Sequence, residues 1–213
     1  MDLTWYGLSC FRIRGRQATV VTDPYPSAAG LRAPRWEGDL VTVSHHHPNH
    51  DQAALVRGAT LIDGPGEYEV KGVGVLGVHS YHDGQAGQAH GPNTIYVIEL
   101  DEVRVCHLGD LGHRLDDQTL EALDEVDVLL VPTGGGSALD GTQAAEVVRQ
   151  IEPRFVVPMH FFTPGLKVPL EPLDRFLKEM GVAAPEPAPR LSVQASAGEY
   201  ETRIVVLEPR TQG

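Results

Sequence analysis

The sequence feature that most constrains this chain is a cluster of histidines directly behind a short β-branched run. The stretch VTVSHHHPNHD, residues 41–51, holds four of the ten histidines within six residues. A strand that ends just before the cluster would place His45 and His47 on the same side, since alternate residues of an extended chain share a face. His46 would point the other way. We therefore expect two imidazoles to face one common point.

A third histidine can reach that point if the chain turns back after the strand. Pro48 ends the extended run, and the apolar spacing over 51–57 predicts a short helix that begins close to His50. Imidazole is a neutral ligand for divalent first-row metal ions, and bonds of about 2 Å require several imidazoles on a rigid scaffold. The alternative, a solvated histidine-rich loop, fits poorly behind a buried strand.

Three other predicted strands end in further candidate ligands. Asp110 follows the run VRVCHLGD, His160 follows RFVVPMH, and the segment HSYHD offers His82 with His79 three residues earlier. Polar side chains in loops beyond strand ends are typical of sites in layered α/β folds. Taken alone, His160 is as compatible with a buried core histidine, and Asp110 with a turn aspartate. The metal-site hypothesis depends on the whole set.

Composition narrows the class of protein and of partner. The 213 residues, 41% of them hydrophobic and 22% charged, predict one globular domain over 1–213. The net charge is −12 and no block of basic residues occurs, which disfavours nucleic acid as a partner. We find neither a signal-peptide pattern nor a stretch typical of a membrane span, and we expect buried free thiols at Cys10 and Cys106. These features predict a cytoplasmic protein with no membrane partner.

The apolar pattern predicts a layered α/β fold with a β-rich first half. Hairpins are expected to turn at 15–16, 71–72 and 101–102, and further strands at 40–44, VDVLLVP and RFVVPMH. Helical spacing appears over 116–123, 140–151 and 170–180, where Asp140 can cap the second helix. A last hairpin is predicted over 192–207.

The motifs resemble those of a known family. SHHHPNHD is similar to the HxHxDH signature of the metallo-β-lactamase superfamily, and LGDLG, PTGGG and VVPMH resemble its downstream landmarks in the expected order. The opening GLSCFRI and VTDP resemble the first hairpin of small members, including the branch with ascorbate-6-phosphate lactonase. This resemblance implies a four-layer αββα sandwich with two metal ions at the sheet edges.

The resemblance also implies a ligand set. His45, His47 and a later histidine would hold the first ion, His50 and His160 the second, and Asp110 would bridge the two. His82 is the preferred later histidine, since the strand GVGVLGVHSY leads into it and Asp83-Gly84 marks the loop; His79 remains the alternative. Asp23 matches a structural position beneath the metals.

One residue departs from the family pattern. Asn49 stands where the signature has an aspartate that supplies a carboxylate to the second ion. An amide oxygen can still coordinate a metal, but it carries no formal charge. We therefore expect a weaker second site, with one or two ions per chain. Zinc is expected, and manganese or iron would also suit these ligands.

The predicted chemistry is hydrolysis of a small ester, lactone or amide by a metal-bound hydroxide, with Asp110 as the catalytic carboxylate. His107 and His113 flank Asp110 and are candidates for supporting the ligands or for facing a small-molecule substrate. A non-catalytic metal-binding or sensor protein is the alternative, and a nuclease is less favoured because the chain is acidic. A homo-oligomer is compatible with the sequence.

Overall fold

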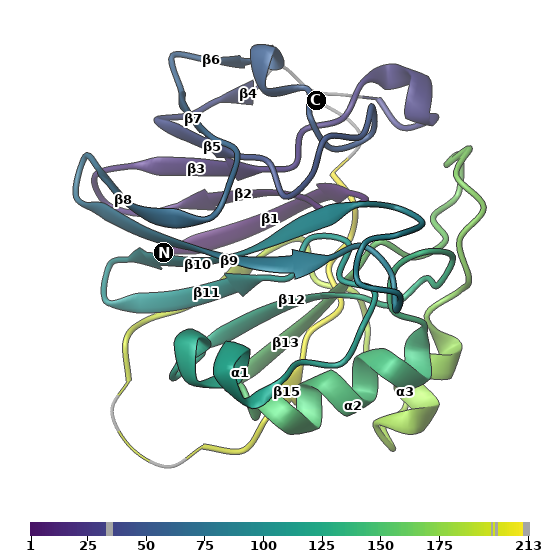
Figure 1. The fold of residues 1–213 in the computed structure, drawn as a ribbon. Helices are drawn as coiled ribbons and strands as arrows, with labels where there is room; N and C mark the ends of the chain where they lie inside the picture. Colours follow the sequence, from purple (N-terminus) through teal and green to yellow (C-terminus); the bar gives the residue numbers. More distant parts are fainter. Residues whose placement is uncertain (33–35, 197, 199, 211–213) are drawn as a thin grey trace.

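Two β-sheets face each other across the main hydrophobic core in the computed structural model, which describes residues 1–32, 36–196, 198 and 200–210 (Figure 1). The six-stranded sheet has the order β14 (Leu191–Ser192), β1 (Asp2–Gly7), β2 (Cys10–Arg14), β3 (Thr19–Thr22), β5 (Leu40–Thr42) and β7 (Thr60–Ile62). The seven-stranded sheet has the order β15 (Arg203–Ile204), β13 (Phe155–Met159), β12 (Val128–Pro132), β11 (Val103–His107), β10 (Pro92–Leu100), β9 (Val73–Tyr81) and β8 (Gly66–Val70).

Three α-helices cover the outer face of the seven-stranded sheet. They are α1 (Asp117–Leu123), α2 (Gly141–Ile151) and α3 (Asp174–Glu179), and their apolar side chains form a second core with that sheet (Figure 1). Asp140 caps α2 as predicted, since its side chain accepts hydrogen bonds from the Thr142 and Gln143 backbone. No helix in the described part of the chain is long and apolar enough to cross a membrane.

The outer layer over the six-stranded sheet consists of short turns and strands, unlike the helical layer on the other sheet. Two 3-10 turns, η1 (Ser27–Ala29) and η2 (Ala53–Leu55), and a two-stranded ribbon of β4 (Trp36–Glu37) and β6 (Val56–Arg57) lie there. The helix predicted over 51–57 is therefore wrong. The end of that segment pairs with Trp36 and Glu37, and Gln52 makes no capping hydrogen bond from its side chain.

The predicted hairpins of the first half are confirmed. β2 and β3 turn at Gly15, β8 and β9 at residues 71–72, and β10 and β11 at residues 101–102. Lys71 and Gly72 both have positive φ, as do Asp101 and Glu102, which suits the two-residue turns of tight hairpins.

The predicted last hairpin over 192–207 is wrong. β14 pairs with β1 in one sheet, whereas β15 pairs with β13 in the other. Each short strand completes a different sheet edge, so the C-terminal segment links the two halves of the sandwich. The apolar pattern of the segment marks the strands but does not say which partner each one meets.

Candidate metal centre

The candidate site lies where loops leave the carboxyl ends of strands in both sheets. Residues 45–50 follow β5, Asp110 follows β11, His160 follows β13, and His82 directly follows β9. Strands β3 and β5 run parallel, as do β11, β12 and β13, so each set of parallel strands opens its loops at one edge. The fold thereby brings together residues that are up to 115 positions apart in the sequence.

Asp110 stands at the centre of a cluster of buried histidines. Its Oδ2 atom lies 3.0 Å from Nε2 of His82, 3.3 Å from Nε2 of His50, 3.3 Å from Nε2 of His160 and 4.0 Å from Nε2 of His45. All five side chains are at most 9% exposed. One carboxylate oxygen therefore faces four imidazole nitrogens in a space screened from water.

The cluster divides into two overlapping groups of metal-ligand type around Asp110. In one, ligand atoms of His45 and His82 lie within 4.8 Å of each other and of the carboxylate; in the other, those of His50 and His160 do so. His47 is exposed at the rim, and its ligand atom lies within 4.8 Å of those of His45 and His50. The pairs His45 with His82 and His50 with His160 are those that the motif implied, whereas His47 is grouped with both His45 and His50 and not with one pair.

Asp23 and Ser44 hold two of the histidines in place through hydrogen bonds to their Nδ1 atoms. The Asp23 carboxylate accepts hydrogen bonds from the Ser44 backbone at 2.8 Å, from the Ser44 hydroxyl at 2.5 Å and from Nδ1 of His50 at 3.2 Å. The Ser44 hydroxyl also lies 3.0 Å from Nδ1 of His45. Since Ser44 donates its proton to Asp23, Nδ1 of His45 must donate to Ser44. Both histidines thus keep Nε2 free to face the cluster.

Hydrogen bonds to Ser9 and Asn93 hold the loop that carries Asp110. The Ser9 hydroxyl donates to Oδ1 of Asp110 at 3.2 Å, and the Asp110 backbone donates to the Asn93 side chain at 3.1 Å. Asn93 also donates to the Leu108 carbonyl. Asp110 therefore has one oxygen bound to the scaffold and one facing the histidines.

Gly109 allows this loop to approach its neighbours. Its φ is +59°, in the left-handed region, and a Cβ atom there would collide with the side chains of Asn93 and Ser44. The first glycine of LGDLG is thus required for close contact between the two loops that carry the candidate ligands.

The electrostatics favour the protonation states that metal binding needs at Asp110, His45 and His160, but not at His50. Burial lowers the pKa of His45 to about 3 and that of His160 to about 4. Burial would raise the pKa of Asp110, but His160 and His50 outweigh it and hold that pKa well below its usual range. Burial likewise opposes the charge on His50, yet the Asp110 and Asp23 carboxylates raise its pKa. At neutral pH the cluster holds an ionised carboxylate beside neutral imidazoles of His45 and His160.

Unpaired nitrogen atoms show that the cluster suits a metal ion. Nε2 of His45 is buried and has no hydrogen-bond partner among the described residues, although its Nδ1 atom is held by Ser44. Nδ1 atoms of His82 and His160 are also buried without a partner there. A buried polar atom without a partner costs about 1–3 kcal/mol, and a divalent ion bound to Nε2 of His45 would remove the cost at that atom.

The two histidines that were alternatives for the first metal site lie in different surroundings. His82 lies in the cluster, whereas His79 is exposed within β9 and stacks edge-on against Tyr81. Asn49 is half-buried in the turn between His47 and His50, and its backbone N–H donates to Nδ1 of His47 at 3.3 Å. The Asn49 side chain makes no hydrogen bond among the described residues.

The two histidines that flank Asp110 face main-chain groups. His107 is fully buried, with Nε2 2.8 Å from the Ser9 carbonyl, and burial lowers its pKa. His113 accepts from the Tyr81 backbone through Nε2 and donates from Nδ1 to the Arg114 carbonyl. Both nitrogens of His113 are engaged, so its ring links its own loop to the end of β9 and is not free for a substrate. His107 supports the Ser9 turn.

Sequence reasoning overlooked Ser9, Ser44 and Asn93. Ser44 had a local signal, since it stands between the buried strand and the first ligand histidine. Asn93 could have been noticed as a polar residue inside an apolar strand pattern, where a buried amide needs several partners. Ser9 had no such signal, because its contact with Asp110 joins positions 101 residues apart.

Comparisons with known proteins agree with this geometry. Residues 2–160 match the family model of the β-lactamase superfamily domain, a span that includes the whole cluster. A UPF0173 metal-dependent hydrolase from Methanoculleus marisnigri is 32% identical over 84% of this chain and 89% of its own length. Another from Methanopyrus kandleri is 28% identical over 85% and 94% of the two chains.

Solved structures point the same way. A proposed Zn-dependent hydrolase of the metallo-β-lactamase superfamily from Thermotoga maritima superposes with a TM-score of 0.78 at 35% identity, covering 97% of this chain and 99% of that one. A metallo hydrolase from Ignicoccus hospitalis shares the fold with a TM-score of 0.69 at 22% identity, over 92% and 99% of the chains. This chain belongs to the metallo-β-lactamase superfamily and is a metal-dependent hydrolase of that group.

Proposed function

We propose that this metal-dependent hydrolase acts on a small ester, lactone or amide, and that Asp110 is its catalytic carboxylate. The observation that carries the proposal is the convergence of four imidazole Nε2 atoms on Oδ2 of Asp110, at 3.0 to 4.0 Å. Because Oδ1 is bound to Ser9, only Oδ2 is available to the reacting groups.

The proposed ligands follow the two groups around Asp110, and His47 is added to the first site as the motif implies. His45, His47 and His82 would hold the first ion, His50 and His160 the second, and Asp110 would lie between them. A divalent ion there lowers the pKa of a coordinated water and polarises the oxygen of the bond under attack. Zinc suits this imidazole-rich set best, and manganese or iron would also be accepted.

Asp110 would orient the attacking water through Oδ2. Its low pKa keeps the carboxylate ionised, so Oδ2 accepts a hydrogen bond from the water and holds the water in one orientation. The same low pKa makes Asp110 a poor store for a proton. We therefore assign it an orienting role, with the proton passing on to solvent or to the leaving group.

The second ion is proposed to bind more weakly than the first. Asn49 provides no carboxylate, so Asp110 is the sole acidic ligand proposed for the two sites. Asp23 partly offsets this loss, because a carboxylate that accepts a hydrogen bond from Nδ1 of His50 makes the imidazole a more basic ligand. A non-catalytic sensor role would rest on Asn49 alone.

The finer properties of partner and location are also proposals. The net charge of −12 favours a small-molecule substrate over nucleic acid. Cys10 and Cys106 are buried free thiols, as a reducing compartment such as the cytoplasm allows. One domain over 1–213 and assembly into a homo-oligomer stay predictions.

The test is hydrolysis of ester, lactone, amide and phosphodiester panels by the metal-loaded protein. We expect turnover of one of the first three classes and a loss of about 100-fold or more in kcat for Asp110→Asn. The control is His46→Ala, which removes an exposed histidine beside the cluster and should keep full activity. Turnover limited to phosphodiesters would replace the substrate proposal, and a fully active Asp110→Asn enzyme would overturn the role of Asp110.

A further inference from the structure

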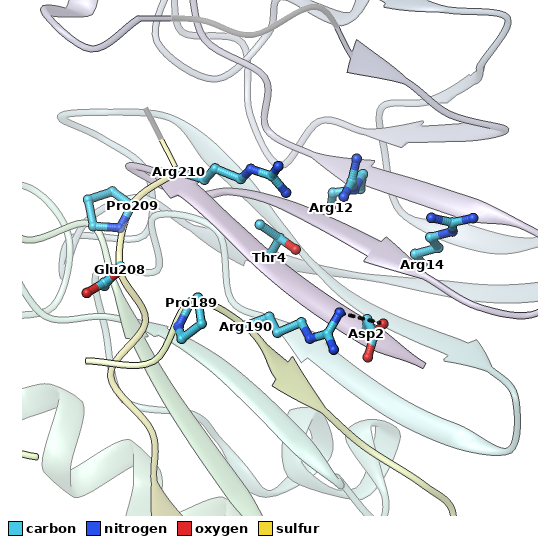
Figure 2. Close-up of a pocket in the computed structure, with 9 residues that line it drawn as sticks. All are labelled: Asp2, Thr4, Arg12, Arg14, Pro189, Arg190, Glu208, Pro209 and Arg210. Carbon is cyan, nitrogen blue, oxygen red and sulfur yellow. Dashed lines mark ion pairs between the residues drawn. The ribbon is translucent and has the colours of Figure 1, made fainter. Parts of the chain in front are cut away.

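A separate hollow opens on the outer face of the six-stranded sheet. In β1, Leu3 and Trp5 point into the core between the sheets, so Asp2 and Thr4 point outward, as do Arg12 and Arg14 of β2. The segments 189–190 and 208–210 border the same hollow, which has a volume of about 520 Å³ (Figure 2). None of its lining residues belongs to the metal cluster.

Four arginines from three parts of the chain line this hollow: Arg12, Arg14, Arg190 and Arg210. Two acidic residues, Asp2 and Glu208, also line it, so the lining carries a formal charge of +2 (four arginines minus two carboxylates). The protein as a whole carries −12. A concentration of arginine in so acidic a chain marks a local positive potential.

Few carboxylates lie close enough to neutralise the positive charges of these arginines. Arg190 lies 3.8 Å from Asp2, a long ion pair between side chains that are 64% and 43% exposed. The other three have no carboxylate partner within ion-pair distance in the described part of the chain. Figure 2 shows Arg210 and Arg190 extending from the C-terminal segments toward the strand pair that carries Arg12 and Arg14.

Arg12 is held in place. Its guanidinium lies 6.0 Å from the centre of the Tyr6 ring, and its Nε atom is buried without a hydrogen-bond partner in the described residues. Thr4, directly opposite in the register of β1 and β2, is also buried. An arginine fixed by an aromatic ring loses less side-chain freedom on binding than a mobile one, so the site is partly preorganised.

We propose that this hollow binds the phosphoryl group of a small anionic molecule, at a site distinct from the metal centre. Guanidinium groups match the geometry of phosphate oxygens and bind them through paired hydrogen bonds. The volume exceeds that of one phosphate ion and is typical of a small-ligand pocket. The strongly acidic remainder of the surface would repel a long polyanion such as nucleic acid.

This proposal does not depend on the proposed hydrolytic function. The N-terminal half of β1 lines the hollow, and the turn after β1 carries Ser9, which is hydrogen-bonded to Asp110. β1 therefore connects the hollow to a residue that contacts the metal centre. Phosphate could also bind at the metal centre, so the test must report binding at each site separately.

The test is a titration of the metal-loaded full chain with inorganic phosphate and with glycerol 3-phosphate, followed by amide NMR and calorimetry at constant ionic strength. We expect shifts at the amides of Thr4, Arg12 and Arg210, and tighter binding of glycerol 3-phosphate than of inorganic phosphate. In the variant Arg12→Gln with Arg210→Gln, affinity should fall by about tenfold or more. The variant Arg14→Gln with Arg210→Gln changes two exposed residues and serves if Arg12→Gln disturbs folding.

The matched control is Arg57→Gln with Arg114→Gln. It also removes two positive charges, but at positions that do not line the hollow. It should bind both ligands as the wild type does. Equal losses in the two double variants would show a general charge effect and overturn the proposal. Shifts confined to the amides of residues 82 and 110 would place the phosphate at the metal centre and also overturn it.

Discussion

Asp23 accepts a hydrogen bond from Nδ1 of His50 at 3.2 Å, and both side chains are almost completely buried. The ionised carboxylate fixes which ring nitrogen carries the proton, so Nε2 of His50 is directed at Asp110. Burial would raise the pKa of Asp23, but the hydrogen bond from His50 and the neighbouring imidazoles lower it. A buried carboxylate behind a histidine is a common support of metal sites.

The first prediction concerns this support. Asp23→Asn keeps the size of the side chain but removes its charge, so the imidazole of His50 becomes a weaker ligand. We expect affinity for zinc to fall by about 10- to 100-fold, measured by competition with a chromogenic chelator. Asp39→Asn is the control, since Asp39 pairs with Lys71 at the surface. Unchanged zinc affinity in Asp23→Asn would show that Asp23 only supports the loops.

The second prediction concerns Asn49. Asn49→Asp restores a carboxylate at the position proposed for the second ion, and we expect the second equivalent of zinc to bind more tightly while the first is unchanged. Calorimetric titration of the metal-free protein resolves the two steps. Equal affinity of wild type and variant for the second ion would refute the proposed weakening.

The third prediction concerns the approach of two ligand-bearing loops at Gly109. Gly109→Ala adds a methyl group that collides with Asn93 and Ser44 at positive φ, and should cost about 3 kcal/mol or more of unfolding free energy. Gly136→Ala is the matched control, since its φ is +77° and a Cβ atom there meets nothing within 4 Å. It should cost only the backbone strain, about 1 kcal/mol. Similar losses in urea unfolding would contradict this account of Gly109.

The fourth prediction concerns the loop after His82. The Asp83 carboxylate accepts hydrogen bonds from four backbone N–H groups, those of residues 85, 87, 89 and 90. Burial opposes its charge, but these bonds outweigh burial and lower the pKa of Asp83 to about 2, from an ordinary value of 3.8. Since the folded pKa is the lower one, the stabilisation is complete above pH 3.8 and is lost as pH falls through about 2.

Carbon-13 NMR of the Asp83 carboxyl group measures this directly, and we expect a midpoint near 2 in the folded protein. Amide exchange of Gln85, Gly87, Ala89 and His90 should be faster in Asp83→Asn at neutral pH, because the amide oxygen is a weaker acceptor. A titration midpoint near 4 would mean that the carboxylate does not hold the loop.

Local patterns explain how much of the fold could be predicted from the sequence. The hairpin at Lys71-Gly72 and the capped start of α2 at Asp140 each depend on a few adjacent residues, and both predictions were confirmed. The helix over 51–57 failed because Val56 and Arg57 pair with a distant strand. The last hairpin failed because its two strands complete different sheets.

The candidate site also has local features that the sequence predicts and long-range contacts that it does not. The histidine spacing at residues 45–50 is local, and the position of Asp110 and His160 behind strands could be read directly from the sequence. The contacts that hold these side chains are mostly long-range: Ser9 to Asp110, Asp23 to His50 and Asn93 to the Asp110 loop. Such contacts depend on how strands are paired, which a single sequence does not specify.

The most direct test of the central claim is the metal content per chain, by elemental mass spectrometry of tag-free protein equilibrated with zinc and then desalted. We predict one or two ions per chain in wild type and in His46→Ala, and a clear loss when His45 and His160 are both replaced by alanine. A wild-type protein that retains no metal, or a double variant that retains as much as wild type, would contradict the assignment of this cluster as the metal centre.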